Sequence, residues 1–392
     1  MLKTVYLDHN ATTPVHAEIK ARVGDWTEAW GNPSSIHFAG RGPKAILRES
    51  RQAIADLLGV APLELIFTGG GSEANNLALK GICERGPLTA QDRNQVFISA
   101  VEHPSVVKAA DYLRSRGFVV EIIPVNRSGE LDLAFLDARV SERTALVSVM
   151  LANNETGHIM PIARVAEIAH RVGALVHCDA VQGLGKIPVK LRELGVDLAT
   201  LSGHKFYALK GCGVLYARKG LNLTSLIHGG GQERGRRAGT ENILGIASLG
   251  HMARKGDQIV AEGERLRGLR DGMEAQILRE ITDVTVTGAD GLRVPGTSSL
   301  VIEGVDGETL LMNLDVRGFA VSTGAACSSG NPEPSPTLLA MGLSRAEAQS
   351  SLRLSLGWGT TAEDLEAFVE ALKAVVARLR SFKHGESYAY GV

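Results

Sequence analysis

The sequence predicts an α/β protein, with a mostly parallel seven-stranded sheet flanked by helices and a smaller α+β domain. Between residues 64 and 217, short apolar runs alternate with amphipathic segments of helical length, which is typical of a helix-flanked parallel sheet. After Gly250 the pattern changes to a long charged helical stretch and a few short strands. A chain of 392 residues is also long enough to form two domains.

Seven apolar runs are the predicted strands of the large sheet: 65–68, 96–99, 118–123, 145–150, 174–178, 197–201 and 214–217. Amphipathic segments such as 105–116 and 161–172 are the predicted connecting helices. In the smaller domain we expect one long helix over 254–281 and short strands at 284–287, 299–303 and 353–356. A final helix is predicted from the capping-box pattern Thr360-x-x-Glu363 to about residue 382.

Polar residues follow two neighbouring predicted strands. Asp179 and Gln182 come after the run 174–176, and Ser202-Gly203-His204-Lys205 comes after the run 196–201. Because ligand sites in such sheets lie outside the carboxyl ends of the strands, we expect these side chains to meet there. Lysine can hold a carbonyl cofactor as a Schiff base, and a carboxylate can keep a pyridine nitrogen protonated. A solvated Lys205 and a helix-capping Asp179 would explain each residue alone, but not the combination.

A glycine-rich run, 69–72, follows the first predicted strand and precedes a predicted helix over 73–80. Backbone amides at the start of a helix carry partial positive charge and suit a phosphate, and Gly71 and Ser72 stand at that position. The alternative is an ordinary serine N-cap. The run is not a GxGxxG fingerprint, and no acidic residue follows in a ribose-binding context, so a dinucleotide is excluded.

Several short motifs occur in a common order from one end of the chain to the other: Tyr6-Leu7-Asp8, 11–14, 31–35, Glu102-His103, 153–155, 228–231, 237–240, Cys327 in a Ser/Gly-rich segment, and 351–355. In these motifs the chain resembles cysteine desulfurases of the NifS/IscS type, within the class V aminotransferase-like family. The resemblance implies the fold of a fold-type I transferase that depends on pyridoxal 5'-phosphate. It also implies that the first residues pack with the smaller domain, so we expect domains of 14–255 and of 1–13 with 256–392.

The resemblance implies roles for the candidate site residues. Lys205 would hold the cofactor, Asp179 its ring nitrogen and Gln182 its phenolic oxygen, while His103 would stack on the ring and move protons. Asn154 would reach the phenolic oxygen or the substrate carboxylate. The cofactor phosphate would be bound by Gly71, Ser72, Ser202 and His204, and by Thr240 from the partner subunit of a homodimer.

Arg353 lies in a predicted strand of the smaller domain. Its guanidinium offers a planar fork for a carboxylate, although an exposed strand arginine is equally consistent with the sequence. The resemblance implies that Arg353 anchors the carboxylate of the substrate, L-cysteine.

Cys327 lies in the segment 322–330, which consists largely of small residues and is followed by Pro332, Pro334 and Pro336. This composition is typical of an exposed, mobile loop, where a free thiol is usually kept only for its reactivity or is incidental. The resemblance implies that Cys327 takes sulfur from L-cysteine as a persulfide, releases L-alanine, and delivers the sulfur to an acceptor protein, such as an iron–sulfur scaffold or a thio-modification enzyme. Selenocysteine lyase, small-amino-acid aminotransferase and a non-catalytic protein that presents Cys327 are the alternatives.

The composition excludes other classes of protein. With 42 basic and 43 acidic residues the charge is balanced, so no nucleic-acid surface is indicated, and Arg234, Arg236 and Arg237 are predicted to form a solvated loop. Four cysteines without CxxC spacing predict neither a disulfide framework nor a metal site, and Cys83, Cys178 and Cys212 lie in apolar, buried surroundings. We expect no membrane-spanning segment and a reducing, cytoplasmic location.

Overall fold

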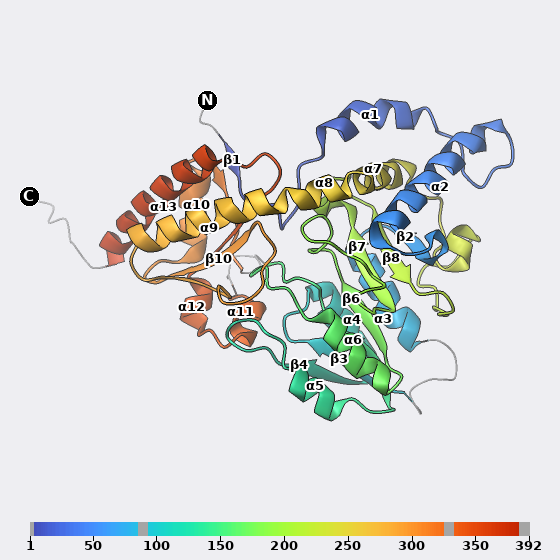
Figure 1. Cartoon of the computed structure of the whole chain (residues 1–392), viewed down its shortest axis with the longest axis horizontal. Coiled ribbons are helices and arrows are strands. Elements are labelled where there is room, and N and C mark those ends of the chain that lie inside the picture. Colours follow the sequence, from blue (N-terminus) through green and yellow to red (C-terminus); the bar gives the residue numbers. More distant parts are fainter. Residues whose placement is uncertain (1–3, 85–92, 325–332, 384–392) are drawn as a thin grey trace, which may run out of the picture.

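The computed structural model describes residues 4–84, 93–324 and 333–383. Its large sheet contains β2 (Leu65–Thr68), β3 (Gln95–Ser99), β4 (Val119–Ile123), β5 (Thr144–Ser148), β6 (Leu175–Asp179), β7 (Leu198–Ser202) and β8 (Gly213–Ala217). The strand order is β2-β8-β7-β6-β5-β3-β4, and β8 runs antiparallel to both of its neighbours while the remaining pairs are parallel. The predicted seven-stranded, mostly parallel sheet is therefore confirmed (Figure 1).

Helices cover both faces of this sheet. One face is covered by α3 (Gly71–Cys83) and α4 (Pro104–Ser115), and the other by α2 (Phe38–Leu58), α5 (Leu133–Arg139), α6 (Ile162–Arg171) and α7 (Ile243–Ala253), with α1 (Ala17–Thr27) packed on α7. The sequence of α6 explains why this helix packs on the sheet. Its apolar residues recur on one helical face, and they are buried: Ile162, Val165, Ala166 and Ala169. This packing holds the strand ends in place.

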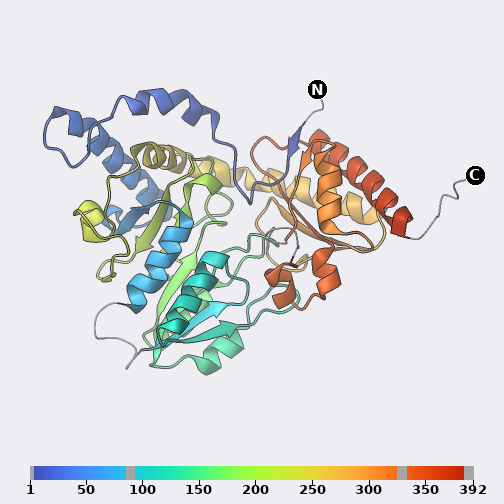
Figure 2. The same cartoon turned by 180° about the vertical axis from the view of Figure 1, so that it is seen from behind.

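A second hydrophobic core lies beside the first (Figure 2). Its antiparallel sheet consists of β9 (Val284–Val286), β10 (Thr297–Ile302) and β12 (Ser351–Ser355), and its helices are α9 (Gly263–Glu280), α10 (Gly307–Asp315) and α13 (Ala362–Lys383). Two short helices that lie between β11 and β12 in the sequence, α11 (Pro336–Ala340) and α12 (Arg345–Gln349), bury Leu338 and Ala348 in the first core instead. The N-terminal strand β1 (Val5–Tyr6) pairs in parallel with β11 (Phe319–Ala320), and Val5 and Leu7 are buried in this core. The domain boundaries themselves stay a prediction.

The single long helix predicted over 254–281 is wrong. The structure has α7, then α8 (Gly256–Ala261), and then α9, with interruptions around Lys255 and Glu262. A Cβ on Gly256 would lie 2.3 Å from Leu57 Cδ1 on α2, so the start of α8 lies close to that side chain. Hydrophobic periodicity does not reveal either of these two breaks.

The capping box of α13 lies one residue later than predicted. The Thr361 hydroxyl accepts a hydrogen bond from the Asp364 amide at 3.2 Å, and the Asp364 carboxylate accepts one from the Thr361 amide at 3.1 Å. The Thr360 hydroxyl instead accepts from the Gly357 amide at 3.1 Å. Either of the two adjacent threonines could have capped the helix. Thr360 is hydrogen-bonded to the turn at Gly357, so Thr361 is the residue that caps α13.

The arginine cluster is also not a solvated loop. Arg234 and Arg236 donate to the main-chain carbonyl of Leu63 at 2.9 and 3.0 Å. Arg237 forms an ion pair with Glu73 on α3 at 2.9 Å. These contacts attach the segment to the edge of the large sheet, so its arginines stabilise the fold.

Cys83, Cys178 and Cys212 are buried, as predicted. Within the described part of the chain, no helix combines the length and the apolar character needed to cross a membrane.

Candidate active site

A cavity of about 350 Å³ opens at the carboxyl edge of the large sheet. Strands β6 and β7 end there, α3 begins there, and β12 reaches it from the second core. It is lined by most of the predicted site residues: Gly71, Ser72, His103, Asn154, Asp179, Gln182, Ser202, His204, Lys205 and Arg353. Parallel strand ends thus bring together side chains that lie far apart in the sequence.

Lys205 ends a short 3-10 helix, Gly203–Lys205, directly after β7. Its ammonium donates to the main-chain carbonyls of Asn10 and Ala11, both at 2.5 Å. Burial lowers the pKa of Lys205 to about 8, and the charge of Arg353 adds to this effect, against the carboxylates of Asp8 and Asp179. At pH 7 about a tenth of such an amine is unprotonated, roughly 300-fold more than at the ordinary lysine pKa.

Asp179 ends β6 and is almost fully buried. One carboxylate oxygen accepts from the Val181 amide at 3.1 Å, and the other accepts from the Asn75 side-chain amide at 2.7 Å. Both oxygens are therefore held in place by hydrogen-bond donors. Asn75 comes from α3 and lines the cavity, but no motif in the sequence pointed to it.

His103 is the N-cap of α4, followed by Pro104 at the first helical position, as predicted. Burial of the imidazole lowers the pKa of His103, with the charge of Lys205 acting in the same direction and Asp179 opposing both. The residue itself remains exposed at the mouth of the cavity. The neutral imidazole is accordingly the favoured form near neutral pH.

Glu102 precedes His103 and is buried beneath the cavity floor. Its carboxyl group accepts from the Ser99 hydroxyl at 2.5 Å and from the Met150 amide at 2.7 Å. Burial and the nearby charge of Asp179 raise the pKa of Glu102 to about 8, in spite of these hydrogen bonds. Glu102 thus holds the ends of β3 and β5 together beneath the site.

The phosphate-binding end predicted from the glycine-rich run lies at the start of α3. A Cβ on Gly71 would lie 3.2 Å from Val181 Cγ2 and 3.4 Å from Ser202 Cβ, so glycine keeps this side of the cavity open. Ser202 is buried at the end of β7. Burial, with the charges of Lys205 and Lys210, lowers the pKa of His204 to about 4, so His204 acts as a neutral hydrogen-bonding group.

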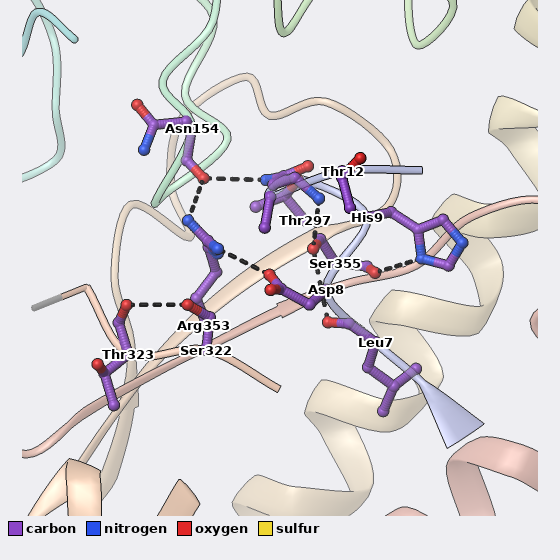
Figure 3. A network of polar contacts seen from close by, with 12 residues as sticks. Leu7, Asp8, His9, Thr12, Asn154, Thr297, Ser322, Thr323, Arg353 and Ser355 are labelled. Atoms are coloured by element: carbon purple, nitrogen blue, oxygen red, sulfur yellow. Dashed lines mark hydrogen bonds and ion pairs between the residues drawn. The ribbon is translucent and has the colours of Figure 1, made fainter. Parts of the chain in front are cut away.

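Arg353 is buried on β12 and is already paired within the chain (Figure 3). It forms an ion pair with Asp8 at 2.7 Å and donates to the main-chain carbonyl of Asn154 at 3.2 Å, while its Nε has no partner among the described residues. The side-chain amide of Asn154 points away from this arginine (Figure 3). The guanidinium therefore already has one carboxylate partner within the chain.

Asn10 lines the cavity, a role that the sequence did not predict. Its main-chain carbonyl accepts from Gln182 at 3.0 Å as well as from Lys205, and its side chain accepts from Lys186 at 2.5 Å. Lys186 also donates to the side-chain oxygen of Gln182. Because Lys186 uses the side-chain oxygen of Gln182, the side-chain nitrogen of Gln182 is the group that donates to acceptors such as the Asn10 carbonyl. Burial lowers the pKa of Lys186 well below its ordinary value.

Two predicted site residues are not brought to this cavity in the described chain. Thr240 is exposed and lines a separate, smaller pocket with Glu233 and Arg237. Cys327 lies outside the described residues. The roles of both residues stay predictions.

The residues present fit pyridoxal phosphate. Lys205 provides an amine of lowered pKa, Asp179 provides a carboxylate with both oxygens fixed, and the N-terminus of α3 provides backbone amides beside a glycine. The buried side-chain oxygen of Asn75, which has no partner among the described residues, adds an unused acceptor at the same cavity.

Comparison with known proteins agrees with this geometry. The Aminotransferase class-V family model matches residues 5–368. The chain belongs to this family. A cysteine desulfurase of Cereibacter sphaeroides is 42% identical over 385 residues, covering 97% of each chain. Class-V aminotransferases and these relatives depend on pyridoxal phosphate, so the predicted family and cofactor are confirmed.

Solved structures of the family have the same fold. A NifS-like protein superposes with a TM-score of 0.89 at 34% identity, covering 96% of this chain and 100% of the other. SspA in complex with cysteine superposes with a TM-score of 0.78 at 30% identity, covering 91% of this chain and 99% of SspA. The predicted fold-type I architecture is thereby confirmed.

Proposed function

We propose that this protein is a cysteine desulfurase, which converts L-cysteine to L-alanine and retains the sulfur on Cys327 as a persulfide. The observation that carries the proposal is the single cavity that joins Lys205, Asp179, His103 and Arg353. The family relatives named above include a cysteine desulfurase and a protein solved with cysteine bound, which supports cysteine as the substrate.

Bound pyridoxal phosphate supplies an electron sink beside the α-carbon of the substrate. With the cofactor bound, Asp179 would hold a positive charge on its ring and Gln182 would donate to its phenolic oxygen, and both residues line the cavity. Lys205 would hold the cofactor and would then remove the α-proton, for which its lowered pKa is suited. Arg353 orients the substrate by its carboxylate, and His103 supplies or removes a proton at the mouth of the cavity.

The sulfur step is assigned to Cys327. Its thiolate attacks the sulfur of cysteine, so that an S–S bond forms while the C–S bond of the substrate breaks. The electron pair of the C–S bond stays with the β-carbon, which gains a proton as alanine forms. The persulfide then passes to an acceptor, which we propose to be an iron–sulfur scaffold or a thio-modification protein. We also propose a cytoplasmic location, consistent with the buried thiols of Cys178 and Cys212, which form no disulfide.

An assay with two substrates tests the proposed reaction. With L-cysteine and a thiol reductant, but without a keto acid, we expect alanine and sulfide in equal amounts over many turnovers. An aminotransferase would stop after one turnover, because without a keto acid it cannot return to its starting form. Selenocysteine compared with cysteine by kcat/KM tests the selenocysteine lyase alternative, which requires a strong preference for selenium.

We further propose a homodimer in which Thr240 completes the phosphate site of the partner subunit. In the described chain Thr240 is exposed and lines a different pocket from Lys205. Large apolar side chains between α1 and the start of α2 are also left open to solvent, since Trp30 is 76%, Ile36 95% and Phe38 78% exposed. Such side chains are typical of an interface rather than of a free surface.

Mixing two defective variants tests this composite site. Lys205→Ala subunits combined with Thr240→Ala subunits form mixed dimers, in which one site carries both wild-type residues. We expect activity to rise on mixing, to roughly a quarter of the wild-type value if subunits pair randomly. Light scattering should show a dimer. A fully active monomer, or mixed dimers without any gain, would refute the composite site.

A further inference from the structure

A chain of hydrogen bonds joins the two cavity residues Asp179 and His103. The side-chain nitrogen of Asn75 donates to the Asp179 carboxylate at 2.7 Å and to the Ser105 hydroxyl at 2.8 Å. The Ser105 hydroxyl lies 2.7 Å from Nδ1 of His103, and the Ser105 main-chain amide lies 3.1 Å from the same nitrogen. The function proposed above assigned no task to Asn75 or Ser105.

The direction of each hydrogen bond follows from the main-chain amide. A backbone N–H can only donate, so Nδ1 of His103 must offer a lone pair to Ser105. This is the N-cap bond of α4, and it requires an acceptor. With a lone pair at Nδ1, the Ser105 hydroxyl also donates to His103. Its oxygen is then free to accept from Asn75.

The amide of Asn75 is held in one orientation. If its oxygen and nitrogen were exchanged, the oxygen would face the Asp179 carboxylate, and two acceptors would be in contact. In the observed orientation its own oxygen is buried without a partner among the described residues. A buried unpaired acceptor is costly, so the two donated bonds are the stronger requirement at this position.

We propose that Asn75 and Ser105 are positioning residues that orient the Asp179 carboxylate and hold His103 as the neutral imidazole with its proton on Nε2. Protonation of Nδ1 would set two donors, the imidazole N–H and the Ser105 main-chain N–H, against each other. His103 therefore presents Nε2–H as a donor at the mouth of the cavity. It can accept a proton only after the imidazole turns away from the α4 N-terminus.

The electrostatic surroundings of His103 agree with a neutral ring. The charged groups that act on it are Lys205, which disfavours the imidazolium, and Asp179, which favours it, and burial adds to the effect of the lysine. The consequence for proton transfer rests on the proposed function. The tautomer does not, and it can be measured even if no sulfur is released.

Nitrogen NMR of the full-length protein tests the proposal directly. With ¹⁵N-labelled histidine, the spectrum distinguishes the protonated from the unprotonated ring nitrogen in each of the 11 histidines. A His103→Gln variant assigns the resonance. We expect an unprotonated Nδ1 and a protonated Nε2 near neutral pH, both with pyridoxal phosphate bound and after its removal. A proton on Nδ1 in either state would overturn the proposal.

Variants of Ser105 and Asn75 test whether these two residues determine the pKa and the tautomer of His103. Ser105→Ala should raise the pKa of His103 by about 1 pH unit, because the neutral ring loses a hydrogen bond, and Ser105→Thr should restore it. Asn75→Leu should raise the pKa of His103 by less, because the Ser105 hydroxyl remains but loses the Asn75 donor that orients it. Ser344→Ala removes the N-cap serine of α12 and serves as the matched control, with no expected change at His103. If Ser105→Ala leaves the pKa and tautomer of His103 unchanged, the assignment is wrong.

Discussion

Lys205→Ala should reduce turnover by at least ~10⁴-fold, because the variant loses both the covalent attachment of the cofactor and the base for the α-proton. The described structure offers no substitute amine at this point. Lys186 is the other lysine near the cavity, but it is buried and its hydrogen bonds go to Asn10 and Gln182. Its amine therefore lies behind the polar groups that face the cofactor.

Two measurements separate this loss from misfolding. Borohydride reduction of the wild-type protein should fix pyridoxal phosphate to the peptide that carries Lys205, and the variant should show no such label. Lys210→Ala is the matched control, since Lys210 is exposed in the same segment and should retain nearly full activity. Label on another lysine, or a variant with substantial turnover, would contradict the assignment of Lys205.

The strand ends of the site could be predicted because they depend on local pattern. Apolar runs that end in polar residues locate Asp179 and Lys205 at the same sheet edge, whatever the details of packing. The glycine-rich start of α3 is likewise visible in the sequence, since both the preceding strand and the following helix are strongly patterned. These residues form the part of the cavity made by the large sheet.

The contacts that fix these residues could not be predicted, because they join distant parts of the chain. Asp8 pairs with Arg353 across 345 positions, and Asn10 contacts Lys205 across 195. Each of these side chains has an ordinary solvated alternative when the sequence is considered alone. Only packing of the N-terminal segment between the two cores brings them to the cavity.

Asn75 shows the same limit at shorter range. It lies in the second turn of α3, where an asparagine has no recognisable pattern, and it is buried because α3 packs against the sheet. Its partner Ser105 lies 30 positions away, at the start of α4. Hydrophobic periodicity predicts both helices, but it does not predict which polar side chains meet between their N-termini.

Cys327→Ser should leave the cofactor site intact while it abolishes sulfur release. The described cavity is built without Cys327, so the variant should bind pyridoxal phosphate with unchanged absorbance and should still bind cysteine. Alanine formation should fall by at least ~10³-fold, because a serine hydroxyl is a poor nucleophile towards sulfur near neutral pH, whereas a thiol is partly ionised there. Loss of turnover with an intact cofactor spectrum is a combination that Lys205→Ala cannot give.

Mass spectrometry locates the sulfur. Wild-type protein given cysteine without a reductant should gain one sulfur atom on the peptide that contains Cys327. Cys212→Ala is the matched control, because burial raises the pKa of the Cys212 thiol to about 12 and leaves almost no thiolate to react. This variant should label at Cys327 like the wild type. If Cys327→Ser still releases alanine at the wild-type rate, Cys327 does not accept the sulfur, and the proposed mechanism fails at the thiol step although the cofactor chemistry stands.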